Sequence, residues 1–268
     1  MGTRIGLIAG GGDFPLQALA EAKKRGCFCA VAALRGAATD ELKREADAFE
    51  WFGPAELEKL VSFFKSHEIR DAVMLGKVEH RTIFQKDLQD EGLAPLLACL
   101  PDRSATTLLQ SLIGYLQAHG LAVLDPSEFL APFFCPEGIL GAAAVSEAVG
   151  ADAAYGWPLA KILADSDIGQ TLVVKDRAVV AVEGMDGTDE TIRRGANLAG
   201  DGVVVLKAGR TRQNARIDMP TVGLETMRTL AKARAAALVI EAARVPFFQK
   251  EEALELAARA GVAVLVRR

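Results

Sequence analysis

The chain has 268 residues, of which half are hydrophobic, and it carries a formal net charge of −4 at pH 7. It is long enough for two folded domains, and the lack of a basic tail or a Lys/Arg run argues against a nucleic-acid partner. No apolar run reaches the roughly 18 to 20 residues that span a bilayer, and the first residues lack the pattern of a signal peptide, so we expect a cytoplasmic protein.

Short apolar runs alternate with amphipathic segments in the first half of the chain. In chain order we expect a strand at residues 4–9, a helix at 14–25, a strand at 27–34, a helix at 54–67, a strand at 71–75, a helix at 104–119 and a strand at 121–124. Strands that alternate with helices pair in parallel in layered α/β domains. The sequence therefore predicts a nucleotide-binding N-terminal domain over residues 1–130 with a Rossmann-like parallel sheet.

Residues 131–145 break this pattern with clustered prolines, phenylalanines and glycines, and we interpret them as a linker. The rest of the chain, 146–268, has the pattern of a smaller mixed α/β domain that would carry catalysis. Here we expect a hairpin of strands at 171–175 and 178–183, a helix from Asp189 with Thr188 as N-cap, strands at 203–206, 237–241 and 262–266, and helices at 225–235 and 250–260.

The most informative segment follows the predicted strand at 203–206. It reads Lys207-Ala-Gly-Arg-Thr-Arg-Gln213-Asn-Ala-Arg216-Ile-Asp218-Met-Pro220-Thr221-Val-Gly223. Long polar loops after strands often carry binding or catalytic groups in α/β proteins. If the segment is extended, Arg216 and Asp218 leave it on the same face. This would place a phosphate-binding cation beside a carboxylate that can hold a metal ion or orient water, although a surface salt bridge is the alternative.

Three glycines, Gly10, Gly11 and Gly12, stand between the first strand and the first helix. Glycine there lets backbone N–H groups approach a phosphate, and a tight turn is the alternative. Pro15 occupies the third glycine position of a dinucleotide fingerprint and no acidic residue ends the second strand, which argues against NAD.

Two further groups of charged residues are candidates. Lys77 follows the third strand and could meet a phosphate, although lysine there is often simply solvated. Glu183, Asp186, Asp189 and Glu190 crowd one strand-to-helix loop. They either stabilise the helix dipole or contribute to a Mg²⁺ site.

The segment from Gln213 to Gly223 matches the pattern Gln-x-x-Arg-x-Asp-x-Pro-Thr-x-Gly. Together with residues 6–12, 167–170 and 181–189, this match makes the sequence resemble the LpxI family of UDP-2,3-diacylglucosamine pyrophosphatases of lipid A biosynthesis. That family is metal-dependent and lacks a calcineurin-like metallophosphoesterase fold. The match is densest between Asp167 and Gly223 and poor over residues 77–143.

The resemblance implies a Mg²⁺-dependent hydrolase that cleaves UDP-2,3-diacylglucosamine to UMP and 2,3-diacylglucosamine 1-phosphate (lipid X). It implies Asp218, Arg216 and Gln213 as catalytic residues, with Asp218 and Asp189 as metal ligands. It further implies substrate contacts from Gly10, Gly11, Gly12, Thr188 and Thr221. We add Lys77 and Lys207 as substrate contacts from their charge and position, although the family has asparagine where Lys77 stands.

Two alternatives stay open at this point. The sequence Ser104-Ala105-Thr106 stands where the family carries Gly-Asp-Asp, so the substrate could be another nucleotide sugar. A non-catalytic nucleotide- or lipid-binding module is the other alternative. The partner implied is an acylated UDP-sugar, and both a peripheral contact with the inner membrane surface and a homodimer remain open.

Overall fold

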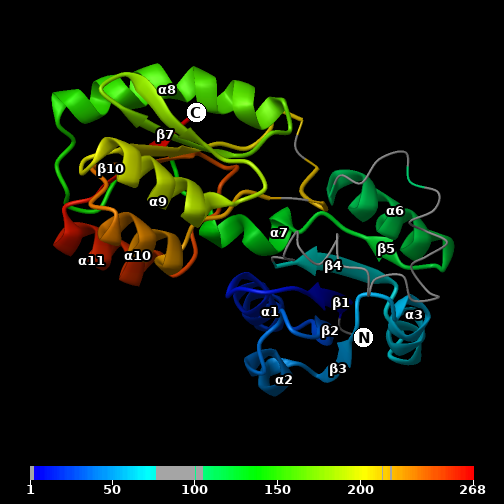
Figure 1. Cartoon of the computed structure of the whole chain (residues 1–268). Coiled ribbons are helices and arrows are strands. Elements are labelled where there is room, and N and C mark those ends of the chain that lie inside the picture. Colours follow the sequence, from blue (N-terminus) through cyan, green and yellow to red (C-terminus); the bar gives the residue numbers. More distant parts are fainter. Residues whose placement is uncertain (1–2, 77–99, 101–104, 213, 218) are drawn as a thin grey trace. The chain divides into compact units, whose positions relative to one another are not determined.

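The computed structural model describes residues 3–76, 100, 105–212, 214–217 and 219–268. The chain forms two compact units (Figure 1). Unit 1 comprises Met1–Leu130 and Asn214–Asp218, and unit 2 comprises Ala131–Gln213 and Met219–Arg268. Each unit is described by itself below.

Unit 1 contains a parallel sheet whose strands follow the order β3-β2-β1-β4-β5. The strands are β1 (Arg4–Ala9), β2 (Phe28–Leu34), β3 (Ala48–Phe52), β4 (Asp71–Leu75) and β5 (Ala122–Val123). Its helices are α1 (Phe14–Lys24), α2 (Glu41–Glu45), α3 (Leu57–Ser66), α6 (Ala105–Ala118) and α7 (Ser127–Leu130). The strand order reverses direction between β1 and β4, as in doubly wound sheets, and ligands bind at such reversal points in this class of fold.

The core of unit 1 lies between the sheet and the helices α3 and α6. Phe64 of α3 and Leu116 of α6 are completely buried there, against Ala30 and Ala32 of β2. Both β1 and β2 are nearly continuous apolar runs, which is the usual pattern for parallel strands covered on both faces.

Unit 2 contains a mixed sheet in the order β6-β11-β10-β9-β7-β8. The strands are β6 (Gly138–Leu140), β7 (Thr171–Lys175), β8 (Ala178–Val182), β9 (Val204–Lys207), β10 (Ala237–Glu241) and β11 (Ala263–Arg267). Strands β9, β10 and β11 run in parallel, whereas β6, β7 and β8 pair with their neighbours in antiparallel fashion.

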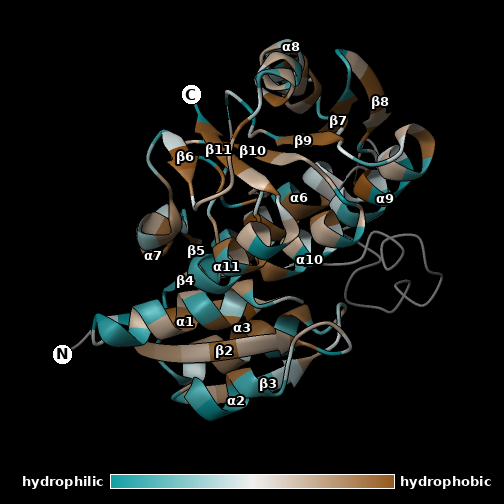
Figure 2. Cartoon of the chain, turned by 90° about the vertical axis from the view of Figure 1, so that its left-hand side faces the viewer, coloured by the Kyte–Doolittle hydropathy of each residue, from teal (hydrophilic) through white to brown (hydrophobic). Residues whose placement is uncertain are grey.

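Helices cover both faces of this mixed sheet (Figures 1 and 2). The long helix α8 (Glu147–Asp165) lies on one face, and α9 (Thr188–Ala199), α10 (Leu224–Lys232) and α11 (Lys250–Ala260) lie on the other. Because side chains alternate along a strand, the residues of β9 and β10 divide between these two layers. Figure 2 shows that the central strands are the hydrophobic part of the unit.

The predicted fold class is confirmed, since unit 1 has a parallel sheet and unit 2 a mixed one. Two details differ. Thr188 is not the N-cap of α9, because the helix begins at Thr188 itself, after Gly187, and the hydroxyl bonds to Glu183 instead. Residues 131–145, predicted as a linker, include a 3₁₀ turn (Ala131–Phe133) and β6.

Within the described residues, no helix has the length and apolar character required to cross a membrane.

Candidate functional site

The glycine loop of unit 1 lies at the reversal point of the parallel sheet. Gly10–Gly12 follow β1, and Gly76 follows the neighbouring strand β4. The N–H of Gly10 donates to the carbonyl of Leu75 at 2.7 Å. A Cβ added to Gly76, which has a φ of +101°, would lie 2.7 Å from the carbonyl carbon of Gly10. The two loops are therefore in direct backbone contact, and they leave Gly12 exposed in front of α1.

In unit 2, polar side chains meet at the carboxyl ends of β9 and β10. Lys207 ends β9 and is in register with Thr171, the first residue of the antiparallel strand β7. Glu183 follows directly after β8, and Thr188 begins the helix α9. Sheet pairing thus gathers four residues that are up to 36 positions apart in the sequence, from Thr171 to Lys207.

A hydrogen-bond chain connects these residues. The Thr188 hydroxyl donates to Oε1 of Glu183 at 3.0 Å and accepts from the Lys207 ammonium. The Thr171 hydroxyl lies 3.3 Å from Thr188 Oγ1, and it also hydrogen-bonds to Glu183. Oε2 of Glu183 accepts from the backbone N–H of Gln170 at 3.1 Å. Both Glu183 and Lys207 are buried, so this is an internal charge pair bridged by a hydroxyl.

The electrostatics of this cluster keep Glu183 ionised. Burial alone would raise the pKa of the Glu183 carboxyl, but the charge of Lys207 and the hydrogen bonds from Thr171, Gln170 and Thr188 together lower it. A buried carboxylate needs such partners, because an isolated charge in the interior is costly. The cluster therefore contains a fixed negative charge next to a fixed ammonium group.

Asp189, next to Thr188, has a carboxylate oxygen suited to a metal ion. Its Oδ1 is buried and has no hydrogen-bond partner among the described residues. No group of three or more His, Cys, Asp and Glu side chains in that part of the chain could hold a metal ion. Mg²⁺ often binds through one or two carboxylates and completes its shell with water and substrate phosphates. Asp189 therefore fits a magnesium ion of this open kind, not one held in a closed protein cage.

The segment 167–170, singled out by its sequence, packs against the Glu183 loop. A Cβ on Gly169 would lie 2.2 Å from the backbone oxygen of Glu183, so glycine is required for this close approach. The approach also brings the N–H of Gln170 to the Glu183 carboxylate. The segment thus supports the position of Glu183.

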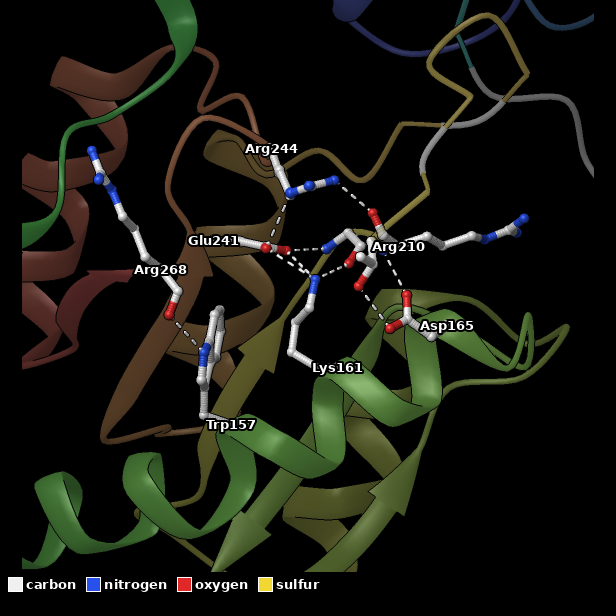
Figure 3. Close-up of polar contacts among 9 residues, drawn as sticks. Trp157, Lys161, Asp165, Arg210, Glu241, Arg244 and Arg268 are labelled. Atoms are coloured by element: carbon white, nitrogen blue, oxygen red, sulfur yellow. Dashed lines mark hydrogen bonds and ion pairs between the residues drawn. The ribbon is translucent and has the colours of Figure 1, made fainter.

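A second charge pair, between the half-buried Lys161 and the buried Glu241, lies on the other face of the sheet (Figure 3). Lys161 points from α8 toward Glu241 at the end of β10, and its Nζ lies 2.9 and 3.0 Å from the two carboxylate oxygens. Lys161 also donates to the carbonyl of Gly209 at 2.6 Å, and the N–H of Gly209 donates to Glu241 at 2.8 Å. The pair therefore holds both backbone polar groups of Gly209, in the loop after β9.

Neighbouring contacts extend this support along the same loop (Figure 3). Arg244 pairs with Glu241 at 3.3 Å and donates to the carbonyl of Arg210 at 2.6 Å. Thr211 donates to Asp165 through its N–H and its hydroxyl, and these bonds lower the pKa of the Asp165 carboxyl. Arg210 forms an ion pair with Asp167. The polar loop predicted from sequence is thus anchored from Lys207 to Thr211.

The remaining predicted site residues are only partly described. Arg216 is half-buried, and its backbone N–H and Nε both donate to the side-chain oxygen of Asn214, at 3.3 and 3.1 Å. Its neighbour Ile217 packs against the core of unit 1. Thr221 is half-buried in unit 2, before Val222, which pairs with Phe247. Lys77, Gln213 and Asp218 lie outside the described residues.

The structure thus brings Thr188 and Lys207 into contact, and it groups Gly10, Gly11 and Gly12 in another unit. Sequence reasoning did not identify Glu183 as the centre of a network, nor the pair of Lys161 and Glu241. One signal was available, since Glu183 and Glu241 each directly end or follow an apolar strand, where a carboxylate is unusual unless it has a partner.

These observations define the class: a two-unit α/β protein whose candidate residues lie at the carboxyl ends of strands in a parallel and a mixed sheet. Comparison with known protein families then identifies the family. The LpxI N-terminal domain matches residues 4–133, and the LpxI C-terminal domain matches residues 136–265. The chain belongs to the LpxI family.

Two individual proteins can be compared with the chain. The UDP-2,3-diacylglucosamine pyrophosphatase LpxI of Caulobacter vibrioides is 28% identical over 273 residues, which cover 98% of this chain and 96% of the relative. A crystal structure of phosphoribosylglycinamide synthetase from Anaerococcus prevotii is 12% identical and covers 72% of this chain and 42% of that one. Its TM-score is 0.26, so no argument about fold or function rests on it.

Proposed function

We propose that this protein hydrolyses the diphosphate of UDP-2,3-diacylglucosamine and releases UMP and 2,3-diacylglucosamine 1-phosphate. The observation that carries the proposal is family membership along both units, together with a relative of that name that aligns with nearly the whole chain.

The reaction needs groups that bind a diphosphate and activate water. Water attacks one phosphorus, the bridging P–O bond breaks, and the bridging oxygen leaves with the other phosphate. Lys207 and Arg216 are the cations that would bind the phosphates, and a guanidinium can do so through two parallel hydrogen bonds. Asp218 would orient the water or hold the metal, and Gln213 would help to orient the water; both roles rest on the motif.

Asp189 and Asp218 would hold a Mg²⁺ ion. When bound, the ion would screen the negative charge that develops on the diphosphate. The buried, unpartnered oxygen of Asp189 supports this assignment. Gly11 and Gly12 would offer backbone N–H groups to the nucleotide, and Gly10, whose N–H donates to Leu75, would let the nucleotide approach the loop closely. Lys77, Lys207 and Thr221 would contact the substrate, and Thr188 would belong to the same site through its contact with Lys207.

The proposed substrate carries two acyl chains, and such chains partition into membranes. We therefore place the activity in the cytoplasm, at the inner membrane surface. The peripheral membrane contact and a homodimer stay predictions.

The test is UMP release from UDP-2,3-diacylglucosamine by the purified protein, measured by mass spectrometry with Mg²⁺ and with a chelator. We expect metal-dependent UMP, and a loss of about 100-fold or more in Asp218→Asn and Asp189→Asn, as for other groups that stabilise transition-state charge. Glu190→Gln is the matched control, because it removes an exposed carboxylate one position after Asp189. Full activity in both aspartate variants, with the fold intact, would reject the site.

A second candidate is hydrolysis of another nucleotide sugar. It is favoured by one observation, the sequence Ser104-Ala105-Thr106 in place of the family's Gly-Asp-Asp. A panel of nucleotide sugars with and without acyl chains separates the two candidates by which substrate gives UMP fastest. Binding of the panel without any Mg²⁺-dependent product would instead identify a non-catalytic module.

A further inference from the structure

We propose that Glu183 is a positioning residue, which acts through the hydroxyl of Thr188 to hold the ammonium group of Lys207 for a substrate diphosphate. This inference rests on the proposed function, because it assigns Lys207 to the phosphates. It adds a residue that carries no role in the motif and gives Thr188 a different one. Thr188 connects two side chains of the protein and does not itself contact the substrate.

The direction of the hydrogen bonds leads to this role for Thr188. A hydroxyl has one proton and two acceptor sites. The proton is directed to Oε1 of Glu183 at 3.0 Å, and Lys207 donates to the oxygen. The single proton of Thr188 is therefore used inside the protein. A substrate oxygen would find no donor at Thr188.

Lys207 differs from Thr188 in this respect. An ammonium group has three donors, and among the described residues its recorded hydrogen bond is the one to Thr188. The bond to Thr188 fixes the direction of the side chain, and the remaining donors are available for an anion. Lys207 is only 6% exposed, so a long, flexible side chain is held in one place at the end of β9.

The negative charge that stabilises this buried ammonium comes from Glu183. The carboxylates on the elements around Lys207 include Glu183 after β8, Asp186 in the same loop, Asp189 on α9 and Glu241 on β10. Asp186 pairs with Arg194 at 2.8 Å. Glu241 belongs to the opposite face, since its neighbour Ile240 is the residue in register with Lys207, and it is engaged by Lys161. Asp189 makes no recorded contact with Lys207 among the described residues and is the proposed metal ligand. Glu183 is therefore the carboxylate that is coupled to Lys207 through Thr188.

The Glu183 carboxylate is itself fixed at both oxygens. Oε1 accepts from Thr188 and Oε2 accepts from the N–H of Gln170 at 3.1 Å. Gly169 allows this second bond, because any side chain there would overlap the backbone of Glu183. A carboxylate that cannot rotate transmits its position to Thr188 and then to Lys207, which is what a positioning residue requires.

The experiment measures the affinity of the full chain for UDP by calorimetry at a fixed Mg²⁺ concentration, in the wild type and in a set of variants. We expect Lys207→Met to weaken binding about tenfold or more, as for a lost charge-assisted hydrogen bond. Glu183→Gln and Thr188→Val should weaken it several-fold. Thr188→Ser keeps the hydroxyl and should stay within about twofold of the wild type.

The decisive comparison uses double variants. If Glu183 acts through Lys207, Glu183→Gln has no further effect on UDP affinity in the Lys207→Met background, because interacting residues are non-additive. A general loss of stability would weaken binding in either background. Asp186→Asn is the matched control, since this carboxylate lies in the same loop but pairs with Arg194. If Glu183→Gln does not fold, the Thr188→Val and Thr188→Ser pair makes the same comparison.

Three results would overturn the inference: no UDP binding by the wild type, unchanged affinity in Glu183→Gln and Thr188→Val, or equal effects of Glu183→Gln with and without Lys207. UMP release tests the proposed function separately. Turnover without coupling would reject the positioning role alone, and coupling without UMP release would reject the hydrolase while the phosphate-binding role of Lys207 stands.

Discussion

The carboxyl edge of β1 and β4 in unit 1 is built from backbone, whereas the edge of β9 and β10 in unit 2 is built from charged side chains. In unit 1, the loops at Gly10 and Gly76 touch through main-chain atoms. In unit 2, Lys207 and Glu241 are buried at neighbouring strand ends, and each is compensated by an opposite charge nearby. The same position in two α/β sheets is thus occupied by groups of different chemistry.

The two edges are therefore expected to be sensitive to different substitutions. A backbone edge offers N–H groups whose strength does not depend on pH, and it is disturbed by added volume. A charged edge offers an ammonium group and carboxylates, and it is disturbed when one partner of a pair is removed. The predictions below test the two sensitivities one at a time, beginning with the largest effect.

Loss of one partner of the Lys161–Glu241 pair should have the largest effect on stability. Among the described residues, Lys161→Met leaves the buried Glu241 carboxylate with Arg244 as its charge partner, and it removes the donor to the carbonyl of Gly209. We expect the free energy of unfolding to fall by about 3 kcal/mol or more, as for other broken buried pairs. Urea denaturation measures it.

The control for this prediction is Lys59→Met in unit 1. Lys59 lies 2.7 Å from Glu50, but both side chains are about 40% exposed, and exposed pairs contribute at most about 1 kcal/mol. Equal losses of unfolding free energy in Lys161→Met and Lys59→Met would show that the Lys161–Glu241 pair stabilises the fold no more than an exposed pair does.

Added volume should disturb the backbone edge of unit 1. The Cβ of Gly76→Ala would lie 2.7 Å from Gly10 and 2.8 Å from Pro15, at a positive φ. The backbone strain and the overlap together should lower the free energy of unfolding by about 2 to 3 kcal/mol. Gly36→Ala is the matched variant, because Gly36 also has a positive φ but nothing within 4 Å of the added Cβ. Gly36→Ala therefore measures the cost of the backbone strain alone. If it lowers the free energy of unfolding as much as Gly76→Ala does, the overlap of the added Cβ with Gly10 and Pro15 has no effect.

The fold was predictable from sequence wherever apolar periodicity was clear. The predicted helix at 250–260 and the strand at 237–241 agree with α11 and β10. The helix α8 was missed, because Gly150, Gly156 and Pro158 interrupt its pattern. Gly156 has a packing reason: an added Cβ would lie 2.8 Å from Leu206 and 2.9 Å from Val174, so glycine lets α8 approach the sheet. This packing constraint depends on the folded sheet, so the local sequence does not reveal it.

The sequence predicted which residues belong to the site better than it predicted the contacts between them. Thr188 and Lys207 were identified through the family resemblance, but their contact depends on the pairing of β9 with β7 and of β7 with β8. Lys161 and Glu241 are 80 positions apart, and neither belongs to a recognised motif. No local pattern in the sequence contains that information, since it arises from the strand order and from where α8 packs.

The last prediction concerns pH and should have the smallest effect at neutrality. The pKa of Glu183 is lower in the folded protein than its ordinary value of 4.5, because Lys207 and three hydrogen bonds outweigh the effect of burial. Its ionised form therefore stabilises the fold fully above that value, and the contribution is lost as pH falls through the lower folded pKa. The Glu183→Gln variant has no carboxylate to protonate at this position. Its free energy of unfolding should therefore fall less steeply with decreasing pH than that of the wild type below about pH 4.5. Urea denaturation at a series of pH values measures the slopes, with Glu190→Gln, which removes an exposed carboxylate on the following helix α9, as control. If both variants keep the wild-type slope, the Glu183–Lys207 pair does not contribute to stability, and the charged edge of unit 2 is as insensitive to pH as a backbone edge.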